Sequence, residues 1–185
     1  MRIVGGMHRG RPLVAPKGHS TRPTADRTRQ AIFNVLDHAA WSPGLEGRRA
    51  IDLFAGAGAL GLEALSRGAA FCLFVDTDAA ARAAIGNNIE ALRLEGHARV
   101  DGRDATRLGP PPEAGEKFDL AFLDPPYSEG LSEPALAALA NGGWLAPGAL
   151  IVVERGMGEA PLAVPGFQTA DCRTWGAARV VFLKA

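Results

Sequence analysis

The sequence has few of the residues on which metal centres, disulfide frameworks and covalent active sites depend. It contains two cysteines, Cys72 and Cys172, and neither stands in the short spacings typical of metal ligands. Both lie in apolar, strand-like runs, so we expect buried free thiols in a reducing cytoplasm. The four histidines are scattered along the chain, and no serine or cysteine has the surroundings of a nucleophile. We therefore expect neither a metal site nor a covalent nucleophile.

We also expect neither a membrane-spanning segment nor a secretory leader. No apolar run reaches the roughly 20 residues that cross a bilayer, and no signal peptide precedes the first motif. We expect a cytoplasmic, monomeric protein without a membrane partner. The 185 residues are 47% hydrophobic, which excludes a disordered chain and suits one domain with a real core. We predict a single domain over residues 1–185, with an extension at 1–45 and a core at 46–185.

An overall excess of charge is absent as well, because 20 basic residues balance 20 acidic ones. Residues 1–30, however, contain seven arginines or lysines and one acid, so this segment carries +6 and the remainder −6. Such asymmetry indicates a nucleic-acid-facing arm on a mildly acidic body, although a merely solvated N-terminus would have the same composition. Interleaved glycines and prolines favour a basic surface hairpin, followed by a helix from Thr24 to Ala40.

Apolar runs alternate with helical patterns from about residue 48 to residue 155. This alternation indicates a parallel sheet with right-handed crossovers, and therefore an α/β fold. Strands are predicted near residues 49–53, 71–75, 98–101, 118–123 and 149–154, and a closing antiparallel pair at 167–173 and 178–184. Ligands of such sheets lie at the carboxyl ends of the strands.

The most informative motif is Asp124-Pro125-Pro126-Tyr127, which follows one of these predicted strands. The two prolines fix the backbone and remove two N–H donors, which leaves carbonyl acceptors pointing outward. The aspartate adds a further acceptor and the tyrosine adds a flat aromatic face. A rigid group of acceptors beside a stacking surface suits a planar base with an exocyclic amine. The alternative is an ordinary strand followed by a Pro-Pro turn.

A glycine-rich turn follows the first predicted strand, with Gly56, Gly58 and Gly61 in the G-x-G-x-x-G spacing of dinucleotide-binding folds. Glycine permits the tight turn and lets a ligand approach the backbone closely. Asp52 precedes the glycines, where a carboxylate would repel a pyrophosphate and attract a cationic amine. An adenosine cofactor that carries an ammonium and no phosphate fits this pattern, and S-adenosylmethionine is that molecule.

Two further acids follow predicted strands. Asp76 stands 20 residues beyond Gly56, where a carboxylate can accept hydrogen bonds from both ribose hydroxyls. Asp104 could accept a hydrogen bond from the adenine amino group, or it could cap a helix, and the sequence favours neither. Asp78 is interpreted as the N-cap of a helix over residues 79–94. We expect Asp52, Asp76, Asp104 and Asp124 to share one edge of the sheet.

These motifs together resemble those of the class I S-adenosylmethionine methyltransferases. The whole chain resembles one family among them, the RsmD-type 16S ribosomal RNA guanine-N2 methyltransferases. The N-terminal blocks Met1–Gly6, Arg9–Arg11 and Arg22–Asn34 follow the family pattern in order, and residues 52–68 are close to its cofactor motif. The family varies at Asp76, often Glu, and at Tyr127, often Phe.

The resemblance implies a Rossmann-like fold with a mostly parallel seven-stranded sheet, an antiparallel C-terminal strand, and an N-terminal β-hairpin and helix. It implies methyl transfer from S-adenosylmethionine to guanine N2, of the guanine(966) type, in 16S rRNA of the small ribosomal subunit or its assembly intermediate. The implied catalytic residues are Asp124, Pro125, Pro126 and Tyr127. The implied cofactor contacts are Asp52, Phe54, Ala55, Gly56, Gly58, Asp76, Thr77, Asp104 and Ala105, although Phe54 is better explained as a core residue. The implied RNA contacts are Arg9, Arg11, Arg22, Thr24, Arg27 and Arg29.

Four other functions fit part of the pattern. A DNA adenine-N6 methyltransferase uses the same amine chemistry, but this chain has no spare length for a target-recognition region. A protein-glutamine methyltransferase would resemble Asn-Pro-Pro-Tyr rather than the motif found here. A non-catalytic RNA-binding protein on the same fold would not need Asp124 and the intact glycine turn, and a nicotinamide oxidoreductase would not need Asp-Pro-Pro-Tyr.

Overall fold

The computed structural model describes residues 1–16, 23–113, 115–126 and 129–185, with the side chains of residues 23–25 left aside. Arg22, Tyr127 and the side chain of Thr24, which the sequence analysis singles out, therefore lie outside the described part of the molecule. No helix in the described ranges is long and apolar enough to cross a membrane.

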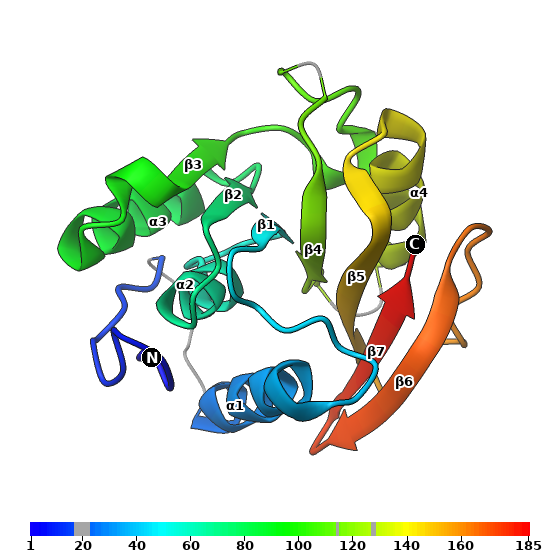
Figure 1. Ribbon diagram of the computed structural model, residues 1–185, viewed down its shortest axis with the longest axis horizontal. Coiled ribbons are helices and arrows are strands. Elements are labelled where there is room, and N and C mark those ends of the chain that lie inside the picture. The colour runs from blue at the N-terminus through cyan, green and yellow to red at the C-terminus, as the bar shows by residue number, and fades with distance from the viewer. Residues whose placement is uncertain (17–22, 114, 127–128) are drawn as a thin grey trace.

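The described strands form one seven-stranded sheet in the order β3-β2-β1-β4-β5-β7-β6 (Figure 1). Strands β1 to β5 are parallel, whereas β7 is antiparallel to both β5 and β6. The strands are β1 (Arg49–Leu53), β2 (Phe71–Val75), β3 (Ala98–Asp101), β4 (Phe118–Leu123), β5 (Leu145–Gly156), β6 (Gln168–Trp175) and β7 (Ala178–Lys184). The predicted α/β fold is confirmed, and β5 is longer than the predicted run because it begins four residues earlier and ends two residues later.

Helices cover both faces of this sheet. They are α1 (Pro23–His38), α2 (Ala59–Ser66), α3 (Ala79–Leu92) and α4 (Ser132–Gly142), with short 3-10 helices η1 (Glu95–His97) and η2 (Ala105–Arg107). The first three pack on one face, and α4 with η2 packs on the other. Two of the predicted helices end two residues earlier than expected: α1 ends at His38 and α3 at Leu92.

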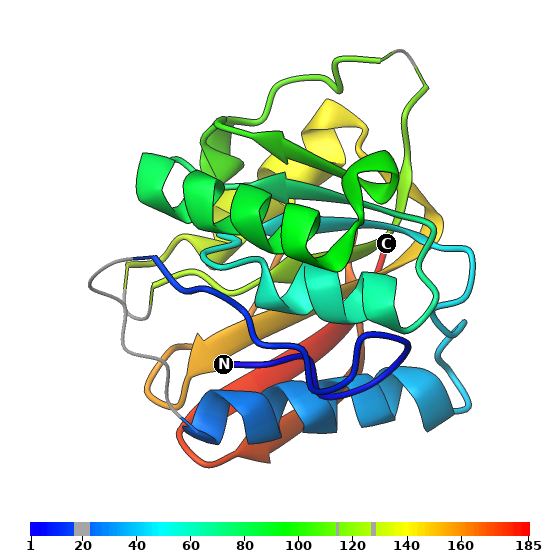
Figure 2. The same cartoon turned by 90° about the vertical axis from the view of Figure 1, so that its left-hand side faces the viewer.

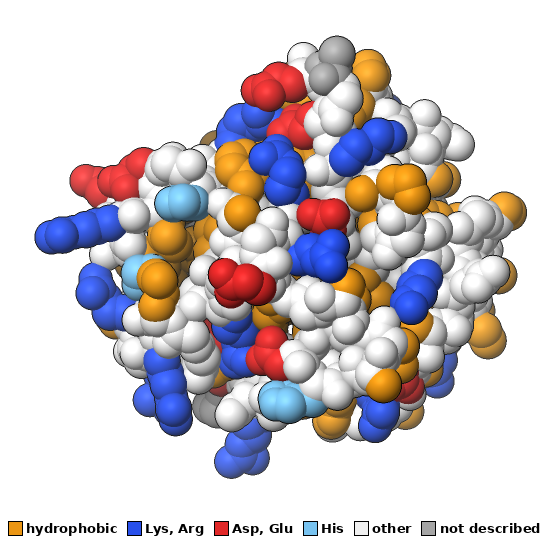
Figure 3. Space-filling model, in the orientation of Figure 1, with side chains coloured by type: hydrophobic (Ala, Val, Ile, Leu, Met, Phe, Trp, Pro, Cys, Tyr) orange, Lys and Arg blue, Asp and Glu red, His pale blue; other side chains and the backbone are white. Residues whose placement is uncertain are grey.

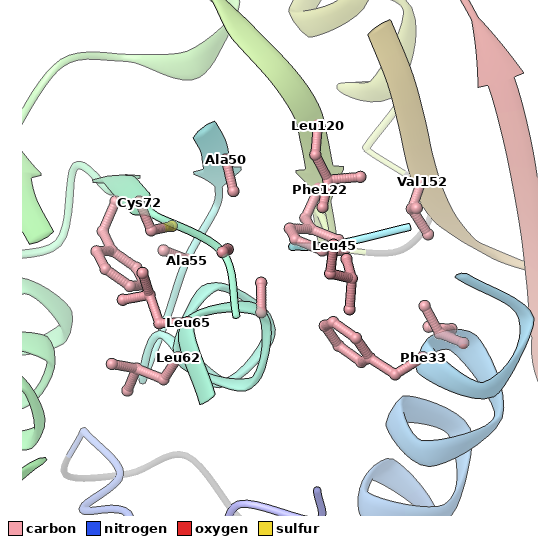
Figure 4. Close-up of a cluster of buried hydrophobic side chains, with 14 of the residues drawn as sticks. Phe33, Leu45, Ala50, Ala55, Leu62, Leu65, Cys72, Leu120, Phe122 and Val152 are labelled. Carbon is pink, nitrogen blue, oxygen red and sulfur yellow. The ribbon is translucent and has the colours of Figure 1, made fainter. Parts of the chain in front are cut away.

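Alternation along the strands divides the core into two layers. Ala50, Phe122 and Val152 belong to the layer beneath α1, α2 and α3, whereas Ile51 and Leu123 belong to the layer beneath α4. Figure 4 shows the first layer, in which Phe33 of α1 points toward Phe122 of β4, and their ring centroids are 5.5 Å apart. The layers fix which side chains can meet at the carboxyl ends of the strands.

The N-terminal arm, residues 1–16, packs on the helical layer rather than standing free. An antiparallel bridge joins Arg2 and Pro12, and backbone hydrogen bonds run from Ile3 N to the Arg11 carbonyl and from Leu13 N to the Met1 carbonyl, so the predicted hairpin is present as a short pairing. Ile3 is fully buried in the first core layer. Figure 2 shows the arm running between α1 and α2, which brings it close to the start of α2 and its preceding loop.

Candidate active site

The carboxyl ends of β1, β2, β4 and β5 meet at one edge of the sheet. Leu53 pairs in register with Val75 on one side and with Leu123 on the other, and Leu123 pairs with Val153. Residues that directly follow these positions therefore cluster. Asp76 and Asp124 directly follow Val75 and Leu123, and Asp52 directly precedes Leu53, so register brings three of the four predicted acids into this cluster.

The glycine-rich loop after β1 has the backbone that its glycines permit. Gly56 and Gly58 have φ angles of 57° and 76°, in the left-handed region that favours glycine. A Cβ atom on Gly56 would meet no described atom within 4 Å, so the loop surface there is open to a ligand. Gly61 serves packing instead, because its Cβ would lie 2.4 Å from the Phe74 ring and 2.5 Å from Cys72 Sγ.

Asp52 is buried beneath this loop, with an exposed fraction of 1%. Its Oδ2 accepts a hydrogen bond of 2.9 Å from the backbone N–H of Gly61, which ties the end of β1 to the first turn of α2. Burial raises the pKa of Asp52 well above its usual range; the Gly61 bond opposes the shift, and the charges of Asp124 and Asp76 add to it. Asp52 thus holds the loop in place, and direct contact with a cofactor stays a prediction.

Asp76 fixes the same loop from the neighbouring strand. Its Oδ2 accepts from Gly56 N at 2.8 Å, and its Oδ1 accepts from Asp78 N at 2.9 Å. A carboxylate oxygen can accept more than one hydrogen bond, so these contacts are compatible with additional hydroxyl donors. Asp78 caps α3 by accepting from Ala80 N, which confirms the predicted N-cap.

Asp104 proves to be a helix cap. Its Oδ1 accepts from both the backbone N–H and the hydroxyl of Thr106, at 2.8 and 2.7 Å, and these bonds lower its pKa. The neighbouring Ala105 is buried in the second core layer, beneath α4 and η2. Thr77 is exposed, and Phe54, with a φ of 58°, packs against the same layer as Ala105.

Asp124 directly follows β4, and its side chain is exposed whereas Pro125 is buried. Protein atoms nevertheless crowd the carboxylate, and this desolvation, together with the negative charge of Glu154, raises the pKa of Asp124. A carboxylate of raised pKa binds a proton more readily than an ordinary aspartate does.

Glu154 is the acid that the sequence analysis missed. Register between β4 and β5 pairs Leu123 with Val153, so Asp124 and Glu154 occupy equivalent positions on adjacent strands. The signal was present in the sequence, since Glu154 stands at the end of an apolar run, as Asp52, Asp76 and Asp124 do at the ends of their own runs. The edge therefore has a pair of neighbouring carboxylates at the proposed amine position.

The basic residues of the arm and α1 separate into two groups. Arg9, Arg11 and Arg27 are exposed, and Figure 3 shows Lys and Arg side chains along the lower left margin, where Figure 1 places the arm. Arg11 also donates to the carbonyl of Ala91 on α3 at 2.7 Å. Burial contradicts the expected RNA contact of Arg29, because its side chain is only 4% exposed.

Arg29 is buried because it joins the arm to two helices. It forms an ion pair with Asp26 at 2.8 Å, lies 3.7 Å from Glu63 of α2, and donates to the carbonyl of Arg2. Glu63 in turn accepts from Val4 N. Charge counting along the sequence could not separate Arg29 from its exposed neighbours, since Glu63 lies 34 positions away.

The two cysteines differ in their exposure to solvent. Cys72 is fully buried, as predicted, but the prediction for Cys172 is wrong because its side chain is exposed. Strand β6 lies at the sheet edge, and none of its residues is fully buried. Within the described residues, no group of three His, Cys, Asp or Glu side chains could hold a metal ion.

The strand order, with its antiparallel β7, and the glycine loop at the carboxyl edge define a Rossmann-like class I methyltransferase fold. The family model described as "Conserved hypothetical protein 95" matches residues 1–184, so the chain belongs to that family, the RsmD-type methyltransferases.

Named relatives and solved structures agree with this placement. The chain is 40% identical over 154 residues to "Ribosomal RNA small subunit methyltransferase D" of Escherichia coli, which covers 83% of this chain and 74% of the relative. It is 35% identical over 166 residues to the protein of the same name from Haemophilus influenzae, covering 89% and 83%. The structure described as "Putative methyltransferase yhhF from Escherichia coli" superposes with a TM-score of 0.83 at 35% identity, covering 100% of this chain and 97% of that one.

Proposed function

We propose that this protein transfers a methyl group from S-adenosylmethionine to the exocyclic N2 of a guanine in 16S ribosomal RNA. The names of the relatives support an rRNA substrate. The observation that carries the proposal is the Asp124-Glu154 pair, which lies at the same sheet edge as the open turn at Gly56. A methyl donor at the Gly56 turn and a base amine at the carboxylate pair could meet at this edge.

The residues present fit S-adenosylmethionine. The backbone at Gly56 is open where a side chain would otherwise stand, and Asp76, bonded to that backbone, offers remaining acceptor positions to ribose hydroxyls. The cluster of Asp52, Asp76 and Asp124 favours a cationic ligand. When bound, the cofactor supplies the methyl group on a sulfonium, so the protein supplies mainly position.

The protein's own groups act on the amine. In the ionised form, Asp124 and the carbonyl of Pro125 accept hydrogen bonds from the two N2 hydrogens, which turns the nitrogen lone pair toward the methyl group. Methylation leaves a positively charged nitrogen that must lose a proton. Asp124, with its raised pKa, accepts that proton. Tyr127 stacks on a base that is unpaired or flipped out of its helix.

Transfer of labelled methyl groups tests the proposal. We expect the purified protein to label 16S rRNA, naked or in small subunits and their assembly intermediates, and nucleoside digestion to yield N2-methylguanosine. Calorimetry should detect S-adenosylhomocysteine binding and no NADH binding. Labelling of adenine N6 in DNA, or tight NADH binding, would contradict the proposal. Modification at position 966, the cytoplasmic location and a monomeric state stay predictions.

A further inference from the structure

Asn88 of α3 joins two segments of the chain that the proposed function assigns to different ligands. Its side-chain Nδ2 donates to the carbonyl of Val14 at 2.9 Å and to the carbonyl of Ala57 at 3.0 Å, and its Oδ1 accepts from Val14 N at 2.8 Å. Val14 lies near the end of the basic arm, and Ala57 lies between the two glycines of the loop. One side chain therefore touches both the proposed RNA arm and the proposed cofactor loop.

These contacts define the orientation of the amide. Carbonyl oxygens can bond only the NH2 group, and the Val14 N–H can bond only the amide oxygen, so the group fits in one way. Both donors of the amide are used within the protein, and its side chain is 1% exposed. Asn88 therefore has no donor left for a ligand, and it acts on binding only through the two segments.

The arm also bonds to α2, the helix that directly follows the glycine loop. Val4 N donates to Glu63 Oε2 at 2.8 Å, and Met7 N donates to the carbonyl of Ser66 at 2.7 Å. These bonds hold the first half of the arm against the body of the helix. Within the described residues, the hydrogen bonds that link the arm to the loop itself pass through Asn88, which bonds Val14 of the arm and Ala57 of the loop.

We propose that Asn88 is a positioning residue that couples the arm to the glycine loop, so that RNA and cofactor each raise the affinity for the other. The inference rests on the proposed function. Displacing the arm breaks the two bonds at Val14, and displacing the loop breaks the bond at Ala57, so either movement leaves part of the buried amide without a partner. A ligand that orders one segment therefore lowers the entropy cost of ordering the other. Linkage requires the factor to be equal in both directions.

Calorimetry on Asn88 variants tests the coupling. We would measure the dissociation constant of S-adenosylhomocysteine with and without a saturating 16S rRNA fragment, and that of the fragment with and without S-adenosylhomocysteine. We expect the wild type to show one factor of about 5-fold or more in both directions. Asn88→Ser should bring the factor close to one. Asn87→Ser is the matched control, since Asn87 is the exposed neighbour on the same helix, and it should keep the wild-type factor.

Two results would overturn the coupling: a factor of one in the wild type, or an unchanged factor in Asn88→Ser. If that variant does not fold, hydrogen exchange of the wild type decides. S-adenosylhomocysteine alone should slow exchange in the peptide containing Val14, and RNA alone should slow it in the peptide containing Ala57. Unchanged exchange in both would also overturn the inference. A wild type that does not bind S-adenosylhomocysteine would instead refute the proposed function.

Discussion

At the scale of single residues, Asp124 is the group on which the chemistry depends. Replacing it with asparagine keeps its size but removes the charge and the capacity to take a proton. We expect the rate of methyl transfer to fall on the order of 10²–10³-fold, since an acceptor aimed at developing charge is lost. Affinity for S-adenosylhomocysteine should stay within about twofold, because the cofactor loop is held by Asp52 and Asp76.

The control is Asp119→Asn, at the other end of the same strand, which bonds Arg49 N and not the site. Single-turnover transfer and calorimetry would be measured on both variants. A collapse of cofactor binding in Asp124→Asn would show that this carboxylate serves the cofactor rather than the base.

The Asp124-Glu154 pair also predicts how activity depends on pH. Asp124 must be ionised to accept the amine hydrogens, and its pKa is raised, so the transfer rate should increase with pH until that raised pKa is passed. Glu154→Gln removes one of the two causes. It should lower the pKa of Asp124 and move the rising limb toward lower pH, with the plateau rate retained.

Single-turnover rates at saturating cofactor, measured from about pH 5 to 9, would check this. Asp52, the other nearby acid, is present in both the wild type and Glu154→Gln. An unmoved limb in Glu154→Gln would mean that the charge of Glu154 does not act on the reacting carboxylate.

Residues that end apolar runs could be predicted from the sequence, because the strand and its final acid are adjacent in the chain. Asp52, Asp76 and Asp124 were found in this way. Environments made by distant residues could not be found: Arg29 is buried by Glu63, and Asn88 meets Val14 from 74 positions away. Sequence patterns show residue types but not which partners the fold brings to them.

At the scale of elements, the glycine loop and the start of α2 form one unit with β2. Gly61 has an ordinary helical backbone, yet a methyl group there would press on Phe74 and Cys72. We expect Gly61→Ala to lower the free energy of unfolding by about 1–3 kcal/mol, as overpacking does.

Gly86 of α3 provides the opposite case, because its Cβ would meet no described atom within 4 Å. Gly86→Ala should raise the free energy of unfolding by about 0.4–1 kcal/mol, through the lower entropy of the unfolded chain. Urea denaturation of the two variants measures both signs. Equal effects in the two variants would mean that contact with β2 is not the reason why position 61 requires glycine.

Secondary structure was predicted well where the pattern is periodic and locally bounded. Strands β1, β2, β3, β4 and β7 have the predicted limits. The error at β5 arose because Pro147 and Gly148 interrupt its pattern, although the backbone continues as a strand. The error at Cys172 arose because an edge strand and a central strand can have the same apolar alternation.

At the scale of the whole molecule, charge is divided between the arm and the acidic site edge. If the arm contacts phosphates, RNA affinity should fall steeply with salt, since each neutralised phosphate releases counterions. Arg9→Ala should reduce the slope of log affinity against log salt by up to about one unit. Arg173→Ala removes another exposed cation, one that pairs with Asp171 on the edge strand β6, and should leave the slope unchanged. Parallel lines for wild type and Arg9→Ala would refute the role of the arm.

The most direct test of the account is a map of modified nucleotides in 16S rRNA from a strain that lacks this protein. We predict that mass spectrometry finds one N2-methylguanosine lost in that strain, restored by the wild-type protein and not by Asp124→Asn. An unchanged set of N2-methylguanosines in the deletion strain would contradict the account.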